Sequence, residues 1–282
     1  MRKIKRNIYF ENSFAGVSVG AFLFSEHTLL VDAPLKPEDG RAWLAALKEA
    51  GASPRMTLVN LDAHPDRTLG AQTLQADVLA HEEVARQFRR RAAVFKTVRQ
   101  ESGAEWESTP GLTGLRWILP RITFSHTARL HFGDTSLLVV PRPGPGPDAC
   151  WLEAPDEGVL FVGDTLTINQ PPFIGQADLA QWMEQLETLQ SRQYKDYTII
   201  AGRGGKAEGR DAKQMYAMLK DMHGKLRGIS RSRNAPAEIE KLAAKYAERY
   251  MPSSKQRPLY AQRLRYGMQE YATRLLASAK RK

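Results

Sequence analysis

The chain has 282 residues, enough for one large α/β core or two modest ones, and its 42% hydrophobic and 26% charged residues are ordinary for a globular protein. A single cysteine, Cys150, excludes an internal disulfide framework and is typical of a reducing compartment. No apolar run approaches the roughly 20 residues of a membrane helix, and polar residues interrupt the start, so we expect a cytoplasmic protein without a signal peptide or membrane partner.

The net charge of +10 is unevenly spread along the chain. The residues from Lys206 to the C-terminus include 19 Lys and Arg but only 7 Asp and Glu, whereas the preceding residues carry a small net negative charge. Such asymmetry marks either a solvated helical face or a surface for an anionic partner, and the solvated face is the commoner of the two.

The first half of the chain alternates expected strands and helices. Apolar runs separated by polar turns predict strands at 17–24, 28–32, 55–61 and 76–80. Trp43, Leu44 and Leu47 recur at helical spacing and Gly51 follows them, which predicts a helix over 38–50. Another helix is expected over 81–91. The residues that follow are harder to assign, and we expect an insertion of helix and loop at about 86–120.

The second half is expected to begin with strands and end with helices. Its apolar runs predict strands at 122–125, 128–132, 136–140, 149–153, 158–163 and 197–201. Helices are expected over 177–193, 236–250 and 258–279, and the pattern is helical from about 211 onward. Two β-rich halves with helices outside them predict a sheet–sheet core.

Four polar segments follow expected strands, which is where α/β proteins place their sites. The first, at 60–70, reads Asn-Leu-Asp-Ala-His-Pro-Asp-Arg-Thr-Leu-Gly. The other three are Pro-Gly-Pro-Gly-Pro-Asp at 143–148, Gly-Asp-Thr at 163–165 and Gly-Arg-Gly-Gly at 202–205.

In this order and spacing the segments resemble the metallo-β-lactamase superfamily. That family carries H-x-H-x-D-H after an early strand, Gly-His before a later strand, Gly-Asp after a Val-Leu-Phe-type strand, and a final Gly-His. The resemblance covers about residues 8–205 and implies an α/β fold, a four-layer αββα sandwich. We expect residues 1–210 to form this domain and 211–282 to form a basic helical extension packed on it.

The family's ligand positions are only partly retained. Laid over the first motif, Asp62, His64, Asp66 and Arg67 take its four functional positions. Pro145 stands where the second motif has histidine, and Arg203 replaces the final histidine. Asp164 keeps the carboxylate that bridges both metals in the family.

The resemblance leaves ligands for one metal at most. Asp62, His64 and Asp164 form a set for one divalent ion (zinc, iron or manganese) with a position open to water. The other metal position retains Asp66 but gains Arg67 and Arg203, whose guanidinium groups cannot coordinate a metal. We therefore expect one metal ion or none, with an arginine supplying the missing positive charge.

Three functions are compatible with these residues. The first is a metal-assisted hydrolase of an ester, thioester, lactone or phosphodiester, in which Asp66 assists the water while Arg67 and Arg203 anchor an anionic group of a small substrate. The second is a non-catalytic pseudoenzyme that binds a ligand or partner in the same pocket, with the acids and arginines closed into an ion-pair network. The third is nucleic-acid binding through the basic C-terminal helices.

Other residues have simpler interpretations. Tyr260, Leu264, Met268, Tyr271 and Leu275 form an apolar stripe at helical spacing, which favours docking on the core or on a second subunit of a homodimer. The same helices interleave aromatic and basic residues, a pattern also typical of proteins that bind single-stranded nucleic acid. Cys150 is expected to be a buried apolar residue and His81 to have a structural role.

Overall fold

The chain folds into two β-sheets packed face to face with helices outside them. The structure, a computed structural model, describes residues 1–96, 101–250 and 255–279. Within these residues the first sheet has seven strands in sequence order. They are β1 (Arg2–Lys5), β2 (Ile8–Glu11), β3 (Val19–Leu23), β4 (Thr28–Val31), β5 (Met56–Asn60), β6 (Asp77–His81) and β7 (Ile122–Phe124). Strands β1 to β4 pair antiparallel, and β4 to β7 pair parallel.

The second sheet has six strands in the described residues, in the order β13-β12-β11-β10-β9-β8. Their bounds are Ala128–Phe132 (β8), Thr135–Pro141 (β9), Cys150–Ala154 (β10), Val159–Phe161 (β11), Thr198–Ala201 (β12) and Gly205–Lys206 (β13). Only β11 and β12 pair parallel, and the other neighbours are antiparallel. Short 3-10 turns span Pro155–Glu157, Gly163–Thr165 and Arg192–Tyr194.

The facing sides of the two sheets form the central core. Phe22 of the first sheet and Phe161 of the second contact each other with ring centroids 5.8 Å apart. Alternate residues of the strands, such as Val31, Leu152 and Ile200, are buried in the same cluster. The period-2 pattern of apolar residues therefore places one face of each sheet in this core.

The outer face of the first sheet is covered by helices from the first half of the chain. Helix α1 (Pro37–Glu49) begins with proline and acidic residues, as helix starts prefer, and buries Trp43 and Leu47 against the sheet. The shorter helices on this side are α2 (Pro65–Thr68), α3 (Ala71–Leu74), α4 (Glu82–Arg90) and α5 (Glu105–Ser108).

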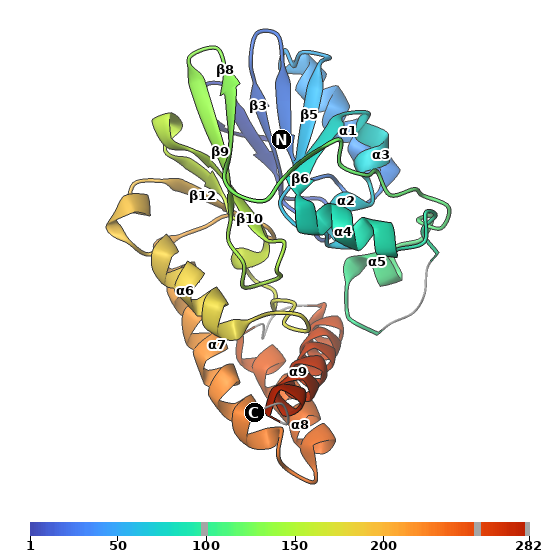
Figure 1. The fold of residues 1–282 in the computed structure, drawn as a ribbon, viewed down its shortest axis with the longest axis vertical. Helices are drawn as coiled ribbons and strands as arrows, with labels where there is room; N and C mark the ends of the chain where they lie inside the picture. The colour runs from blue at the N-terminus through green and yellow to red at the C-terminus, as the bar shows by residue number, and fades with distance from the viewer. Residues whose placement is uncertain (97–100, 251–254, 280–282) are drawn as a thin grey trace.

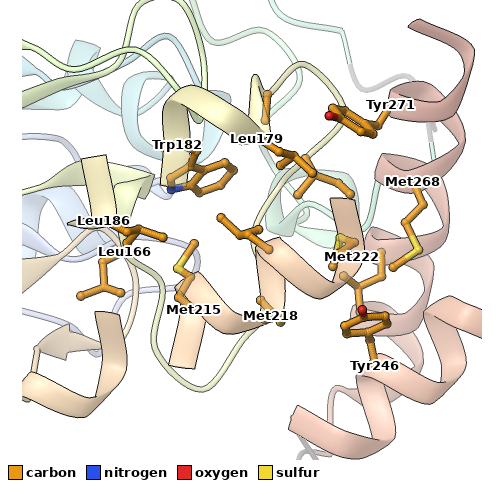
Figure 2. Close-up of a cluster of buried hydrophobic side chains, with 14 of the residues drawn as sticks. Leu166, Leu179, Trp182, Leu186, Met215, Met218, Met222, Tyr246, Met268 and Tyr271 are labelled. Atoms are coloured by element: carbon orange, nitrogen blue, oxygen red, sulfur yellow. The ribbon is translucent and has the colours of Figure 1, made fainter. Parts of the chain in front are cut away.

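Helix α6 (Leu179–Leu189) packs on the outer face of the second sheet and against the C-terminal helices. These are α7 (Gly209–Ile229), α8 (Ala235–Tyr250) and α9 (Arg257–Ala279), which lie together beyond one end of the two sheets (Figure 1). Trp182 of α6, Met218 of α7 and Met268 of α9 belong to one buried apolar cluster (Figure 2). The predicted four-layer sandwich with a helical C-terminal extension is therefore confirmed.

The differences from the expected elements are few. Strands β1 and β2 were not predicted, because the residues of β1 are mostly charged and exposed at the sheet edge. The expected insertion at 86–120 includes residues 97–100, and the expected extension includes 251–254 and 280–282, all of which lie outside the described residues. The division into domains at residue 210 stays a prediction. In the described part of the chain, no helix is long and apolar enough to cross a membrane.

Candidate functional site

Polar side chains gather where parallel strands of both sheets end. Asp32 follows β4, the segment from Asp62 to Arg67 follows β5, Asp164 follows β11, and Arg203 follows β12. Because the carboxyl ends of parallel strands meet at one edge of a sheet, two sheets packed face to face bring these four loops to a shared centre. The fold thus assembles residues that are far apart in the sequence.

Two glycines allow the Asp164 and Arg203 loops to touch. The backbone N–H of Gly202 donates to the Gly163 carbonyl at 2.7 Å. A Cβ on Gly202 would lie 2.4 Å from that carbonyl oxygen, closer than atoms can approach, so residue 202 needs glycine here. This contact holds Asp164 and Arg203 side by side.

Arg67 is fully buried among three carboxylates. Its Nη1 donates to Asp32 Oδ2 at 3.0 Å, and its Nη2 donates to Asp164 Oδ1. Its Nε lies 3.1 Å from Asp62 Oδ1, in an ion-pair contact that lacks hydrogen-bond geometry. One guanidinium therefore neutralises charge from three separate loops.

Arg203 is also fully buried and has a second set of partners. Its Nε donates to Asp164 Oδ1 at 3.1 Å, and its Nη1 lies 2.9 Å from Asp66 Oδ2 and 3.0 Å from Glu105 Oε2. Its Nη2 lies 3.2 Å from His64 Nδ1. Asp164 is therefore shared by both arginines.

A third buried arginine comes from the C-terminal helix α9. Arg263 Nη2 donates to Glu105 Oε1 at 2.8 Å, and its Nε donates to the Gly103 carbonyl at 2.9 Å. Its Nη1 donates to Gln170 Oε1 at 3.0 Å and to the Pro171 carbonyl at 3.1 Å. Arg263 thus ties two loops to the helical extension and extends the network through Glu105.

The network contains more acids than arginines, which sets the protonation of the acids. Burial raises the pKa of Asp66 to about 8, and the neighbouring Glu105 adds to this rise. Burial also raises the pKa of Asp62 to about 7, against the opposing charge of Arg67. Burial opposes ionisation of Glu105 too, but Arg263 and Arg203 lower its pKa to about 2. Asp164, between two arginines, has a pKa well below its usual range despite burial.

His64 is held as a neutral ring. It precedes α2, and its Nδ1 accepts the backbone N–H of Asp66 at 3.2 Å. Burial and the nearby Arg203 hold the pKa of His64 well below its usual value. A neutral ring whose Nδ1 accepts hydrogen bonds carries its proton on Nε2. His64 therefore offers a donor and no free basic nitrogen.

A pocket of about 620 Å³ lies beside the network. Asp62, His64 and Asp164 line it, whereas Asp66, Arg67 and Arg203 do not and are fully buried behind its wall. Aromatic side chains make much of the remaining wall: Phe95, Trp106, Trp117, Phe173 and Tyr266. The structure therefore brings all six predicted site residues together but gives only three of them access to the pocket.

The geometry of four loops around a shared centre agrees with the sequence comparisons. The sequence pattern of the metallo-β-lactamase superfamily matches residues 24–204. The chain belongs to the metallo-β-lactamase superfamily. Among curated protein sequences, none matches this chain significantly.

Solved structures of metallo-β-lactamases share the fold at low sequence identity. The metallo-β-lactamase from Pontibacter korlensis superposes with a TM-score of 0.62 at 17% identity, covering 78% of this chain and 98% of that one. DIM-1 metallo-β-lactamase gives a TM-score of 0.59 at 16% identity, covering 78% and 95% of the two chains. IND-7 metallo-β-lactamase gives 0.59 at 15% identity, covering 78% and 96%. At these identities the similarity shows the fold alone.

The donor set of this superfamily member does not fit a metal ion in the present arrangement. Asp62 and Asp164 are both paired with Arg67, and Arg203 occupies Nδ1 of His64. Within the described residues, no group of three or more His, Cys, Asp and Glu side chains is arranged to hold a metal. The assignment of Asp62, His64 and Asp164 as metal ligands stays a prediction.

Three site residues were not predicted from the sequence. Glu105 lies in the expected insertion at 86–120, and no motif in the neighbouring sequence identifies it as a site residue. Arg263 carried a usable signal, because it lies on the same helical face as Tyr260 and Leu264, where a charged residue is out of place. Asp32 ends a predicted strand, but its pairing with Arg67 was not predicted, since Arg67 was expected either to anchor a substrate or to join an ion-pair network with the other site acids.

Two other sequence interpretations agree with the structure. Cys150 is buried, and burial raises the pKa of its thiol well above the usual value, so it is no nucleophile. His81 precedes α4 and accepts the backbone N–H of Glu83 at 3.3 Å, which is a structural helix cap.

Proposed function

We propose that this chain is a ligand-binding member of the metallo-β-lactamase superfamily that works without a metal ion. Arg67 and Arg203 take the place of the positive charge that the family resemblance assigns to metals. The pocket beside them binds a small molecule, and the arginine network keeps the pocket floor rigid. This is the pseudoenzyme alternative among the three functions that the sequence left open.

One observation carries the proposal: two fully buried guanidinium groups lie among the carboxylates at the ligand positions. A guanidinium is always protonated, so a divalent cation placed beside it would meet strong repulsion at low local dielectric. If Arg67 moved away to admit a metal, buried Asp32 would lose its partner, and if Arg203 moved, buried Glu105 would lose one of its partners. Either loss would destabilise the folded chain. Binding of a metal therefore competes with the network that holds the site together.

The proposal is tested by metal analysis of protein purified without an affinity tag. We expect plasma mass spectrometry to find far less than one equivalent of zinc, iron or manganese, both before and after incubation with each ion. Thermal unfolding should be unchanged by chelator or by added zinc. His64→Gln and Asp62→Asn variants should have the same metal content as the unchanged chain.

The second candidate function is the metal-assisted hydrolase, with Asp62, His64 and Asp164 as ligands. It is favoured by the fact that all three side chains line the same pocket. It predicts one equivalent of metal that is lost in both variants, together with hydrolysis in a panel of esters, thioesters, lactones and phosphodiesters. That result would overturn the metal-free proposal.

Several finer expectations stay predictions. They are the cytoplasmic location, a homodimer through the C-terminal helices, nucleic-acid binding by those helices, and a catalytic role for Asp66, Arg67 and Arg203. The burial of Asp66, Arg67 and Arg203 behind the pocket wall favours a structural role for all three over contact with a substrate.

A further inference from the structure

Arg91, at the end of helix α4, differs from the other arginines near the site in having a free donor. Its Nη2 donates to the Ala63 carbonyl at 2.9 Å. Its Nη1 is buried and has no hydrogen-bond partner among the described residues. A buried guanidinium donor without a partner costs free energy, and a ligand acceptor would remove this cost.

Arg91 also borders the pocket. Its guanidinium lies over the ring of Trp117, 4.4 Å from the centroid, and 5.1 Å from the ring of Phe88. Two aromatic faces and the Ala63 carbonyl therefore fix the guanidinium plane. The pocket thus has a positioned cation in its wall.

Most of the other charged residues that line the pocket already have partners, and Lys96 is a further lining cation with an exposed side chain. Asp62 and Asp164 are paired with Arg67, and Asp148 Oδ2 accepts the backbone N–H of Ala63 at 2.6 Å. Arg263 is held by Glu105. Arg91 forms no ion pair within the described part of the chain, although the charges of Asp148 and Asp62 act on it, so its guanidinium is available to a ligand.

The chemistry of the ligand follows from the charges and the walls. Three carboxyl groups in the same pocket would repel a doubly charged phosphate more strongly than a single negative charge. The aromatic walls bury an apolar body of the size of one or two rings, as in most small-molecule sites. Ala63, whose carbonyl accepts from Arg91, directly precedes His64, so His64 lies close to Arg91. The His64 ring carries its proton on Nε2 and adds a neutral donor there.

We propose that the pocket binds a small organic monocarboxylate with an apolar, aromatic-sized body, and that Arg91 holds its carboxylate. This inference rests on the proposed ligand-binding function and names its ligand class. The carboxylate accepts from the Arg91 guanidinium, and the apolar body lies between Trp106, Trp117 and Phe173.

Three probes of matched size test the ligand class: 2-naphthoate, 2-naphthamide and 2-naphthylmethylamine. Binding is followed by titration calorimetry and by quenching of tryptophan fluorescence, since Trp106 and Trp117 line the pocket. We expect 2-naphthoate to bind the full chain at least tenfold more tightly than the amide, and the amine to bind most weakly. Equal binding of acid and amide would overturn the carboxylate proposal while leaving a binding pocket. Binding of none of the three would overturn both the ligand class and the proposed function.

Variants of Arg91 test the residue. Arg91→Met keeps a long apolar stem over Trp117, and we expect it to lose at least tenfold in affinity for 2-naphthoate with little change for the amide. Arg91→Lys should retain part of the preference for the acid. Arg86→Met is the matched control, because Arg86 lies on the same helix with its side chain 49% exposed and paired with Glu83. Circular dichroism confirms folding of each variant, and unchanged binding of the acid by folded Arg91→Met would overturn the role of Arg91.

Discussion

At the scale of single residues, the site replaces coordination bonds with hydrogen bonds from guanidinium groups. A metal ion binds at a point and tolerates several ligand geometries, whereas a guanidinium is planar and directs its N–H groups along fixed lines. Arg67 and Arg203 each contact three or more side chains from different loops. The network therefore fixes the positions of these loops, a role that a metal also has in metalloproteins.

Removal of either buried arginine should strongly destabilise the chain. We expect Arg203→Ala to lower the free energy of unfolding by about 3–5 kcal/mol, because Asp66, Glu105 and Asp164 lose a buried partner. The exposed pair of Arg86 and Glu83 provides the control, and Arg86→Ala should cost less than about 1 kcal/mol. Urea unfolding of both variants measures the difference, and similar values for the two would contradict a structural role for Arg203.

The raised pKa of Asp66 predicts that stability falls as the pH rises. Asp66 has a pKa of about 8 in the folded chain and an ordinary pKa of 3.8, so between these values the folded state holds a proton that the unfolded state has lost. The free energy of unfolding then decreases with pH by up to about 1.4 kcal/mol per pH unit from this group, and levels off above about pH 8. Glu105, with its pKa lowered to about 2, acts in the opposite direction below its ordinary value of 4.5. The two effects cancel between the ordinary values of the two groups, so we expect the stability maximum at about pH 4.

The Asp66→Asn variant isolates this contribution. Asparagine cannot ionise, so the fall in stability between pH 5 and pH 8 should become shallower in urea unfolding at a series of pH values. The variant is expected to be less stable at every pH, because an amide N–H₂ cannot accept from Arg203 as the carboxyl does. An unchanged slope would assign the pH dependence to other groups.

At the scale of elements, the strands and long helices follow from local patterns. The apolar alternation of residues such as Phe22 and Val31 and the helical spacing of Trp43 and Leu47 depend only on near neighbours in the sequence. Loops after parallel strands could be assigned to the site for the same reason, since the strand directions decide where the loops meet. The location of the site was therefore predictable from the sequence.

The partners inside the site could not be predicted in the same way. Whether Arg67 faces a ligand or the core depends on tertiary contacts with Asp32 and Asp164, which come from other loops. Glu105 meets Arg263 through long-range packing of α5 and α9, so the helical pattern that marks Arg263 as buried does not identify its partner. Sequence patterns therefore identified the site residues better than their roles.

Contacts from the α9 helix should stabilise the loops that form the pocket. Arg263 donates to the carbonyls of Gly103 and Pro171, so we expect Arg263→Met to increase hydrogen exchange at 101–108 and 170–175. The variant keeps the apolar stem over Phe173 and removes only the donors. Hydrogen exchange at α1, which packs on the outer face of the first sheet, should stay unchanged.

A neighbouring arginine on the same helix serves as the control for this prediction. Arg265 lies 3.5 Å from Glu101, with its side chain 37% exposed, so Arg265→Met should change exchange far less. If both variants gave the same small change, the loops would be held by packing alone and the Arg263 contacts would have no part in their order.

At the scale of the whole molecule, the helical extension is a layer of the fold. Met215, Met218 and Met222 of α7 pack with Trp182 and Leu186 of α6, and α9 adds Met268 and Tyr271 to the same cluster (Figure 2). Apart from the buried Arg263, the described basic residues of the extension are exposed or half-buried, while its inner face is mostly apolar. The extension therefore continues the apolar layer of α6 and, through Arg263, completes the site.

A chain cut after Glu208 should fail to fold, because it lacks α7 to α9. The cut exposes Trp182, Leu186 and Leu166, which are buried in the intact chain, and leaves Glu105 without Arg263. We expect aggregation, or a compact state without a cooperative thermal transition. A truncated chain that melted cooperatively and still bound an aromatic probe would show instead that residues up to about 210 form an independent domain.

Leu264→Ala distinguishes an integral layer from a separate domain without truncation. Leu264 is fully buried on α9, so its loss should cost about 2–5 kcal/mol through lost burial and an internal cavity. If the extension is a layer of one fold, calorimetry should show a single transition at lower temperature, and binding in the pocket should be lost at that same temperature. Two transitions, with only the first one shifted, would mean that α7 to α9 unfold independently of the two sheets.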